Sequence, residues 1–147
     1  MDIARLFTSV LSMVGPAPDG TPTAPALEPG QRIVAIGDSI TEAGGYLRMA
    51  DAFLATHYPE LGIPPIVNAG IGGQMAGDLV MRFQRDVVDS RHAVVTISIG
   101  VNDVWHWLGA THDEKILTAY KEDVRRMVDM AQRAGIKVIL LAPTVIE

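Results

Sequence analysis

Ser39 lies where a buried strand of this chain is expected to end. The residues before it, 33–36, are all apolar, which is typical of a strand buried on both faces of a parallel sheet. Functional groups of such sheets gather at the carboxyl ends of the strands. Gly37 allows a sharp turn, and Asp38 can hold that turn by accepting hydrogen bonds from nearby amides. The Ser39 hydroxyl would then point into a crevice as a candidate nucleophile; the alternative is a turn that only caps a helix.

Two later loops offer groups that could assist a serine nucleophile. The short β-branched segment 65–68 leads into a glycine cluster that ends at Gly73, and the apolar segment 93–99 leads to Asn102. A glycine lets its amide approach a reacting carbonyl closely, and an asparagine side chain is a neutral, directional donor. Each residue alone is more typical of an ordinary turn. Together with Ser39 they indicate a site that stabilises negative charge on an oxygen.

The elements that must position these loops alternate between strand and helix. Apolar spacing predicts helices at 46–57, at 78–88 and from a capping box at Thr111 and Glu114 to Gly135, and a fourth strand at 137–142. This alternation indicates a parallel sheet with right-handed crossover helices.

Composition excludes several classes of function. The chain has 147 residues, 48% of them hydrophobic and 20% charged, so it is long enough for one globular domain. Its formal charge of -5, without basic clusters, argues against nucleic acid or acidic membranes as partners. It has no cysteine, which excludes disulfides, thiolate metal sites and a cysteine nucleophile. No metal or other cofactor is expected.

Residues 1–30 differ from the domain expected at 31–147. The apolar run 3–14 has the character of a signal-peptide core, but it is too short to span a bilayer and could equally form an amphipathic helix. Five of the nine prolines fall between Gly15 and Gly30, which indicates an extended linker. We expect no transmembrane segment, and we favour a cytoplasmic over a secreted location.

Three blocks in order resemble those of the SGNH (GDSL-type) hydrolases. They are Gly37-Asp-Ser-Ile-Thr41, Asn68-Ala-Gly-Ile-Gly-Gly73 and Gly100-Val-Asn-Asp103, each after an expected strand, and the match covers about residues 32–142. The resemblance implies a flavodoxin-like α/β sandwich of three layers with strand order 2-1-3-4-5. This chain would hold the order 2-1-3-4 without the fifth strand, and Ser39 and Asn102 would face one crevice.

The resemblance also implies roles for the three loops. Ser39 would be the nucleophile of an acyl-enzyme mechanism acting on small carboxylic esters. Its own amide, the Gly73 amide and the Asn102 side chain would form the oxyanion hole. Thr41 stands where a Gly-x-Ser-x-Gly elbow has its second glycine, which argues against an ordinary α/β-hydrolase.

This chain departs from the family's sequence pattern at the general base. Family members carry it in a late Asp-x-x-His block, and this chain ends before such a block. The expected topology places His57 and His92 at the amino-end face of the sheet, away from Ser39, and His106 and His112 on the correct side. Asp103 and His106 have Asp-x-x-His spacing, so His106 is a candidate base. Its alternative roles are to line the acyl pocket or to sit in a solvated loop.

Two other interpretations remain open at this point. The chain could be a catalytically incomplete module that binds a ligand, or that self-associates through the edge of the strand at 138–142. We expect the 147-residue chain alone to be a poor hydrolase and to associate through that edge. A dinucleotide site at Gly70-Ile-Gly72 is disfavoured because the next required glycine would fall at Met75.

Overall fold

A parallel sheet with helices on both faces organises the chain. The computed structural model describes residues 27–105 and 114–142. The strands are β1 (Ile33–Gly37), β2 (Val67–Gly70), β3 (Val94–Ser98) and β4 (Lys137–Leu141), and they lie in the order β2-β1-β3-β4. Every adjacent pair is parallel. The predicted sheet order and direction are confirmed.

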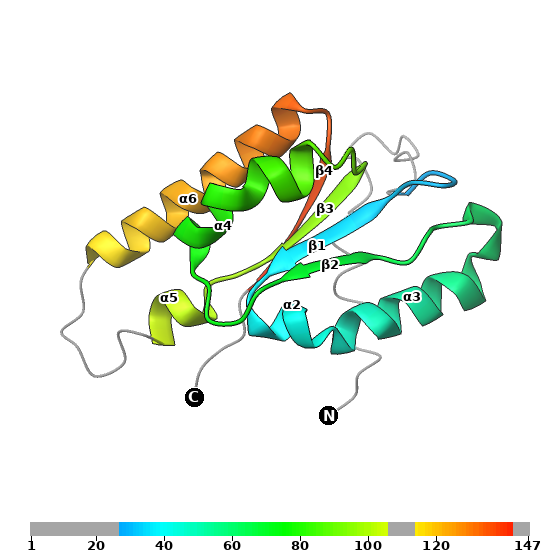
Figure 1. The fold of residues 1–147 in the computed structure, drawn as a ribbon, viewed down its shortest axis with the longest axis horizontal. Helices are drawn as coiled ribbons and strands as arrows, with labels where there is room; N and C mark the ends of the chain where they lie inside the picture. The colour runs from blue at the N-terminus through cyan, green and yellow to red at the C-terminus, as the bar shows by residue number, and fades with distance from the viewer. Residues whose placement is uncertain (1–26, 106–113, 143–147) are drawn as a thin grey trace, which may run out of the picture.

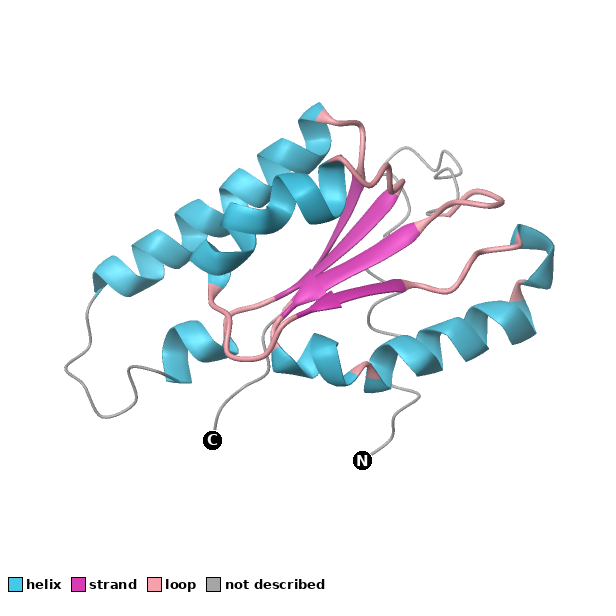
Figure 2. Ribbon diagram, in the orientation of Figure 1, coloured by secondary structure: helices cyan, strands magenta, loops and turns pink. Residues whose placement is uncertain are grey.

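The helices form the two outer layers of a sandwich (Figures 1 and 2). On one face lie α4 (Ala76–Phe83), which continues as the π-helical turn η2 (Gln84–Val88), and α6 (Glu114–Arg133). On the other face lie the short α2 (Ser39–Ala43) and α3 (Gly45–His57), followed by the 3-10 turn η1 (Pro59–Leu61). The short α5 (Val101–Trp105) lies at the end of the sheet where α2 begins. None of the helices within residues 27–105 and 114–142 is long and apolar enough to cross a bilayer.

The main core lies between the sheet and the layer of α4 and α6. Side chains from β1 and β3 pack there against one face of each helix, as period-3.6 apolar spacing predicts. The fully buried members of this core include Val34, Ile36, Leu79, Phe83, Val95, Ile97 and Met127. The most buried strands, β1 and β3, are the two from whose carboxyl ends Ser39 and Asn102 follow.

Two elements begin two residues away from their predicted first residues. Strand β2 begins at Val67, two residues later than expected, because Pro65 has no N–H and the Ile66 amide donates to Asp51 Oδ1 instead of to the ladder. Helix α4 begins at Ala76, two residues earlier than expected. There the Asp78 carboxylate accepts a hydrogen bond from the Met75 amide, and distant Asp103 accepts one from the Ala76 amide. The Thr111 part of the expected capping box lies outside the described residues.

Candidate active site

Ser39 is the first residue of α2 and is exposed at the carboxyl end of β1. Asp38 is the N-cap of that helix and is only 2% exposed; its Oδ1 accepts a hydrogen bond of 2.9 Å from the Ile40 amide. The amides in the first turn of a helix have no partner within the helix, and the Ser39 amide is one of them. The buried Asp38 side chain therefore fixes the turn at the start of α2, and this turn leaves Ser39 exposed.

Gly37 is required at this turn for a reason other than the one predicted. Its φ is not among the positive values, so it does not need the left-handed region. A Cβ at this position would instead overlap Thr41 Oγ1 and lie 2.5 Å from the main-chain oxygen of Ser98. The absence of a side chain lets α2 start close against the end of β3.

The glycine loop after β2 lies directly beside the serine. Gly70 pairs with Gly37 in the sheet register, so both loops leave the same edge. A Cβ placed on Gly72 would lie 3.7 Å from Ser39 Cβ. The next residue, Gly73, is exposed and has a φ of +77°, a left-handed conformation that favours glycine. The structure thus brings the second predicted block against the first.

Asn102 connects the third block to the second. Its side-chain Nδ2 donates a hydrogen bond of 2.9 Å to the main-chain carbonyl of Gln74, one residue after Gly73. A side-chain amide carries two N–H groups, so this bond fixes the orientation of the group and uses one of them. The other N–H has no acceptor among the described residues.

Asp103 has a structural task that the sequence did not reveal. It is 8% exposed, and its two carboxylate oxygens lie 3.1 and 3.2 Å from the Ala76 amide. Burial raises the pKa of this carboxyl, although the Ala76 hydrogen bond favours the charged form. Asp103 therefore holds the start of α4. The predicted pairing of Asp103 with His106 cannot be described, since His106 and His112 lie outside the described residues.

Arg82 and Gln74 stabilise the loop that follows β2. The sequence analysis identified neither residue. Arg82 is 7% exposed, and its Nε donates to Gln74 Oε1 at 2.8 Å. A signal was available: Arg82 follows Leu79 by three residues and so falls on the apolar face of its helix. A charged residue on such a face needs buried partners.

The two described histidines lie where the topology predicted. His57 is the last residue of α3, is exposed, and stacks on Phe53 with ring centroids 4.4 Å apart. His92 precedes β3 and is 5% exposed, and burial lowers the pKa of its imidazole. Both belong to the amino-end face of the sheet. Neither is placed to accept a proton from Ser39.

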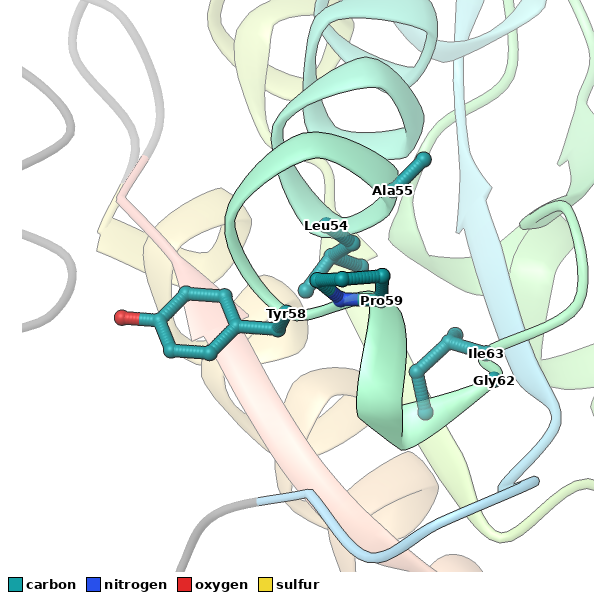
Figure 3. A pocket seen from close by; sticks show the side chains of 6 residues that line it. All are labelled: Leu54, Ala55, Tyr58, Pro59, Gly62 and Ile63. Carbon is teal, nitrogen blue, oxygen red and sulfur yellow. The ribbon is translucent and has the colours of Figure 1, made fainter.

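Hollows in the described surface lie on different sides of the helices. One, of about 220 Å³, is formed by the end of α3 and by η1 and includes Leu54, Tyr58 and Ile63 (Figure 3). It is at the end of the molecule opposite α2, so it is separate from the serine. Another, of about 270 Å³, lies beside α4 and α6 and is lined partly by Asp103 and Tyr120. Within the described residues, no group of three or more acidic or histidine side chains could hold a metal ion.

The sequence of this chain matches the model of a known protein family. The model of the GDSL-like Lipase/Acylhydrolase family matches residues 35–147, which include all three blocks. The chain belongs to this family. Its parallel sheet and its two helical layers are the fold of solved SGNH hydrolase structures.

Two curated relatives and two solved structures illustrate the similarity. The chain is 32% identical over 136 residues to the acetylxylan esterase of Geobacillus stearothermophilus, and 31% identical over 114 residues to the uncharacterized lipoprotein YqeF of Bacillus subtilis. These matches cover 80% and 74% of this chain, but 62% and 46% of the relatives. The crystal structure of that esterase matches with a TM-score of 0.70 and 30% identity, over 79% of this chain and 61% of the esterase. An alpha/beta hydrolase enzyme from the metagenome of Lake Arreo, Spain, matches with a TM-score of 0.72 and 28% identity, over 83% of this chain and 64% of that enzyme.

Proposed function

We propose that the protein is a serine ester hydrolase that forms an acyl-enzyme at Ser39. The observation that carries the proposal is the meeting of the three blocks at one sheet edge: an exposed serine, a glycine loop against it, and Asn102 bonded to that loop. Family membership supports the same assignment. Because the chain spans about 62% of the acetylxylan esterase it matches, the activity of the whole protein is part of this proposal.

The reaction that fits these groups is acyl transfer in two steps. Ser39 Oγ attacks the ester carbonyl carbon while its proton passes to a general base. The Ser39 amide, the Gly73 amide and the free N–H of Asn102 bind the oxyanion of the tetrahedral intermediate. The intermediate then expels the alcohol, which takes up the proton from the base. In the second step the base takes a proton from water as its oxygen attacks the acyl carbonyl carbon. The bond from that carbon to Ser39 Oγ then breaks, Oγ takes the proton from the base, and the carboxylic acid leaves.

The general base belongs to the part of the site that the described residues do not contain. His57 and His92 are on the wrong face, so the base is His106, His112 or a histidine of the late Asp-x-x-His block that the resemblance implies. The esterase of Geobacillus stearothermophilus has catalytic mutants in which a serine, an aspartate, or a histidine three residues after that aspartate is replaced by alanine. That spacing supports a histidine base held by an aspartate.

Short acyl esters are the substrates to test first, and acetylated xylo-oligosaccharides follow from the similarity to an acetylxylan esterase. A serine-directed organophosphate should label Ser39 in a form of the protein that hydrolyses p-nitrophenyl acetate, and mass spectrometry of the labelled peptide locates the adduct. Ser39→Ala should abolish both labelling and turnover. Labelling of another serine, with turnover surviving in Ser39→Ala, contradicts the proposal. Binding of the acetylated oligosaccharide without turnover by the full-length protein would support the binding-module alternative.

A further inference from the structure

Arg82 is a buried cation directly beneath the candidate oxyanion loop. Its guanidinium makes three hydrogen bonds: Nε to Gln74 Oε1 at 2.8 Å, one terminal nitrogen to Asp86 Oδ2 at 2.8 Å, and the other to the main-chain oxygen of Gly37 at 3.3 Å. Asp86, one helical turn later, is the acidic partner of Arg82, and its carboxylate also pairs with the exposed Arg85. The remaining two contacts reach the two loops that carry Ser39 and Gly73.

Hydrogen bonds of Arg82 help to hold both ends of the loop between β2 and α4. At its start, the Ile71 amide donates to the Gly37 oxygen at 3.0 Å, and that oxygen also accepts from Arg82. At its end, Gln74 is held twice: its side-chain oxygen by Arg82 and its main-chain oxygen by Asn102. Gly72 and Gly73, which have no side chains to fix them, lie between these two anchors.

The chemistry of a guanidinium suits this task. Its planar fork presents donors in fixed directions, so one side chain can set the relative position of a strand end and a loop. A lysine ammonium has no such fork. Because an oxyanion donor is effective only when it already points at the developing charge, the position of the Gly73 amide must be set before substrate arrives.

We propose that Arg82 is a positioning residue for the ester hydrolase reaction, and that it acts through Gln74. The Arg82–Gln74 hydrogen bond fixes the loop so that the Gly73 amide and the Asn102 side chain converge on the same oxygen. Arg82 itself does not touch the substrate. The inference rests on the proposed function, because the group that it positions is the proposed oxyanion hole.

The test uses Gln74 rather than Arg82, since loss of a buried charge could prevent folding. Gln74→Met removes the side-chain acceptor but keeps the size of the side chain and the main-chain carbonyl that Asn102 uses. Gln74→Glu restores an acceptor for Arg82. The matched control is Gln84→Met, because the exposed Gln84 also makes one side-chain hydrogen bond, 2.8 Å to Asp89, but lies away from the site.

Three measurements separate positioning from a general structural role. In a form of the protein that hydrolyses p-nitrophenyl acetate, Gln74→Met should lower kcat by up to about 100-fold with KM nearly unchanged, and Gln74→Glu should recover most of that loss. Amide hydrogen exchange should speed up at residues 71–75 in Gln74→Met while the strands keep their protection. The combined effect of Gln74→Met and Asn102→Ala should be smaller than the product of the two single effects, because both act on the same donors. Gln84→Met should change none of these.

The outcomes distinguish this inference from the proposed function. A Gln74→Met variant with kcat within about twofold of the wild type, alongside an inactive Ser39→Ala, overturns the role of Arg82 and leaves the hydrolase assignment standing. Unchanged exchange at residues 71–75 in Gln74→Met also overturns it, whatever the turnover. Full turnover in Ser39→Ala instead removes the hydrolase assignment, and with it the reaction that Arg82 would serve.

Discussion

Asn102 donates its side-chain N–H to the main-chain oxygen of Gln74 at a distance of 2.9 Å. This bond joins the loop after β3 to the loop after β2, one residue beyond Gly73. Asn102 thus both stabilises the glycine loop and is itself oriented by it. A residue in this position can affect catalysis in two ways, by direct contact with an oxyanion and by holding a second donor.

Replacement of Asn102 removes both contributions at once, the direct contact and the hydrogen bond to the Gln74 main-chain oxygen. In an active form of the protein, Asn102→Ala should lower kcat by about 100-fold or more with little change in KM, because the oxyanion forms only on the way to the transition state. Asn102→Asp keeps the size of the side chain but removes the donor, and we expect a loss at least as large. Steady-state kinetics with p-nitrophenyl acetate measures both. An unchanged kcat in both variants would reduce Asn102 to a turn residue.

Replacement of Gly70 tests how closely α2 packs against β2. A Cβ on Gly70 would overlap the Glu42 amide nitrogen and lie 2.5 Å from the Thr41 carbonyl carbon, both of them main-chain atoms that cannot rotate away. Gly70→Ala should therefore lower the free energy of unfolding by about 1–3 kcal/mol. Gly45→Ala is the matched control, because nothing lies within 4 Å of its Cβ position and it begins α3. Urea unfolding of the two variants should separate them, and equal stabilities would contradict the close packing of α2 against β2.

Asp103 should give the stability a specific dependence on pH. Burial raises the pKa of its carboxyl in the folded state above the usual 3.8, so protonation of this group favours folding. Its stabilising contribution is complete below the unfolded value and is lost as the pH rises through the raised folded value. Asp103→Asn keeps an oxygen for the Ala76 amide but has no charge. The variant should therefore gain stability relative to the wild type as the pH rises from about 4 to 7.

Thermal unfolding of the Asp103→Asn variant and the wild type across this pH range provides the measurement. Asp89→Asn is a suitable control, because Asp89 is exposed and its carboxylate bonds only the side chain of Gln84 among the described residues. A difference in Tm between Asp103→Asn and the wild type that does not vary with pH would show that Asp103 titrates as it does in the unfolded chain.

Strand β4 is the candidate surface for self-association. Among the described residues it pairs with β3 alone, and Leu140 on it is 49% exposed. An unpaired strand edge with apolar side chains favours pairing with another chain. We expect sedimentation velocity of the 147-residue chain to show a concentration-dependent increase in mass, and Leu140→Lys to weaken it. A monomer at all concentrations would contradict this expectation.

The sequence by itself determined the fold and the order of the three blocks. Residues 33–36 are all apolar and residues 94–98 are mostly β-branched, which favours strands buried in a sheet. The helices expected between the strands favour parallel pairing with crossovers. Once that order is known, the loops after β1, β2 and β3 must leave the same edge. Ser39, Gly73 and Asn102 could be grouped for this reason before any coordinates were known.

Only the tertiary structure decided which side chains support that group. Arg82 contacts Gly37 from 45 residues away, Asp103 contacts Ala76 from 27 residues away, and Asn102 contacts Gln74 from 28 residues away. These pairs meet only when neighbouring strands are in register. Local spacing constrains backbone conformation, but it carries little information about a hydrogen bond between two loops. The early start of α4 depends in part on such a contact, because Asp103 from a different loop accepts a hydrogen bond from the Ala76 amide. These contacts depend on packing, and packing is a property of the folded chain as a whole.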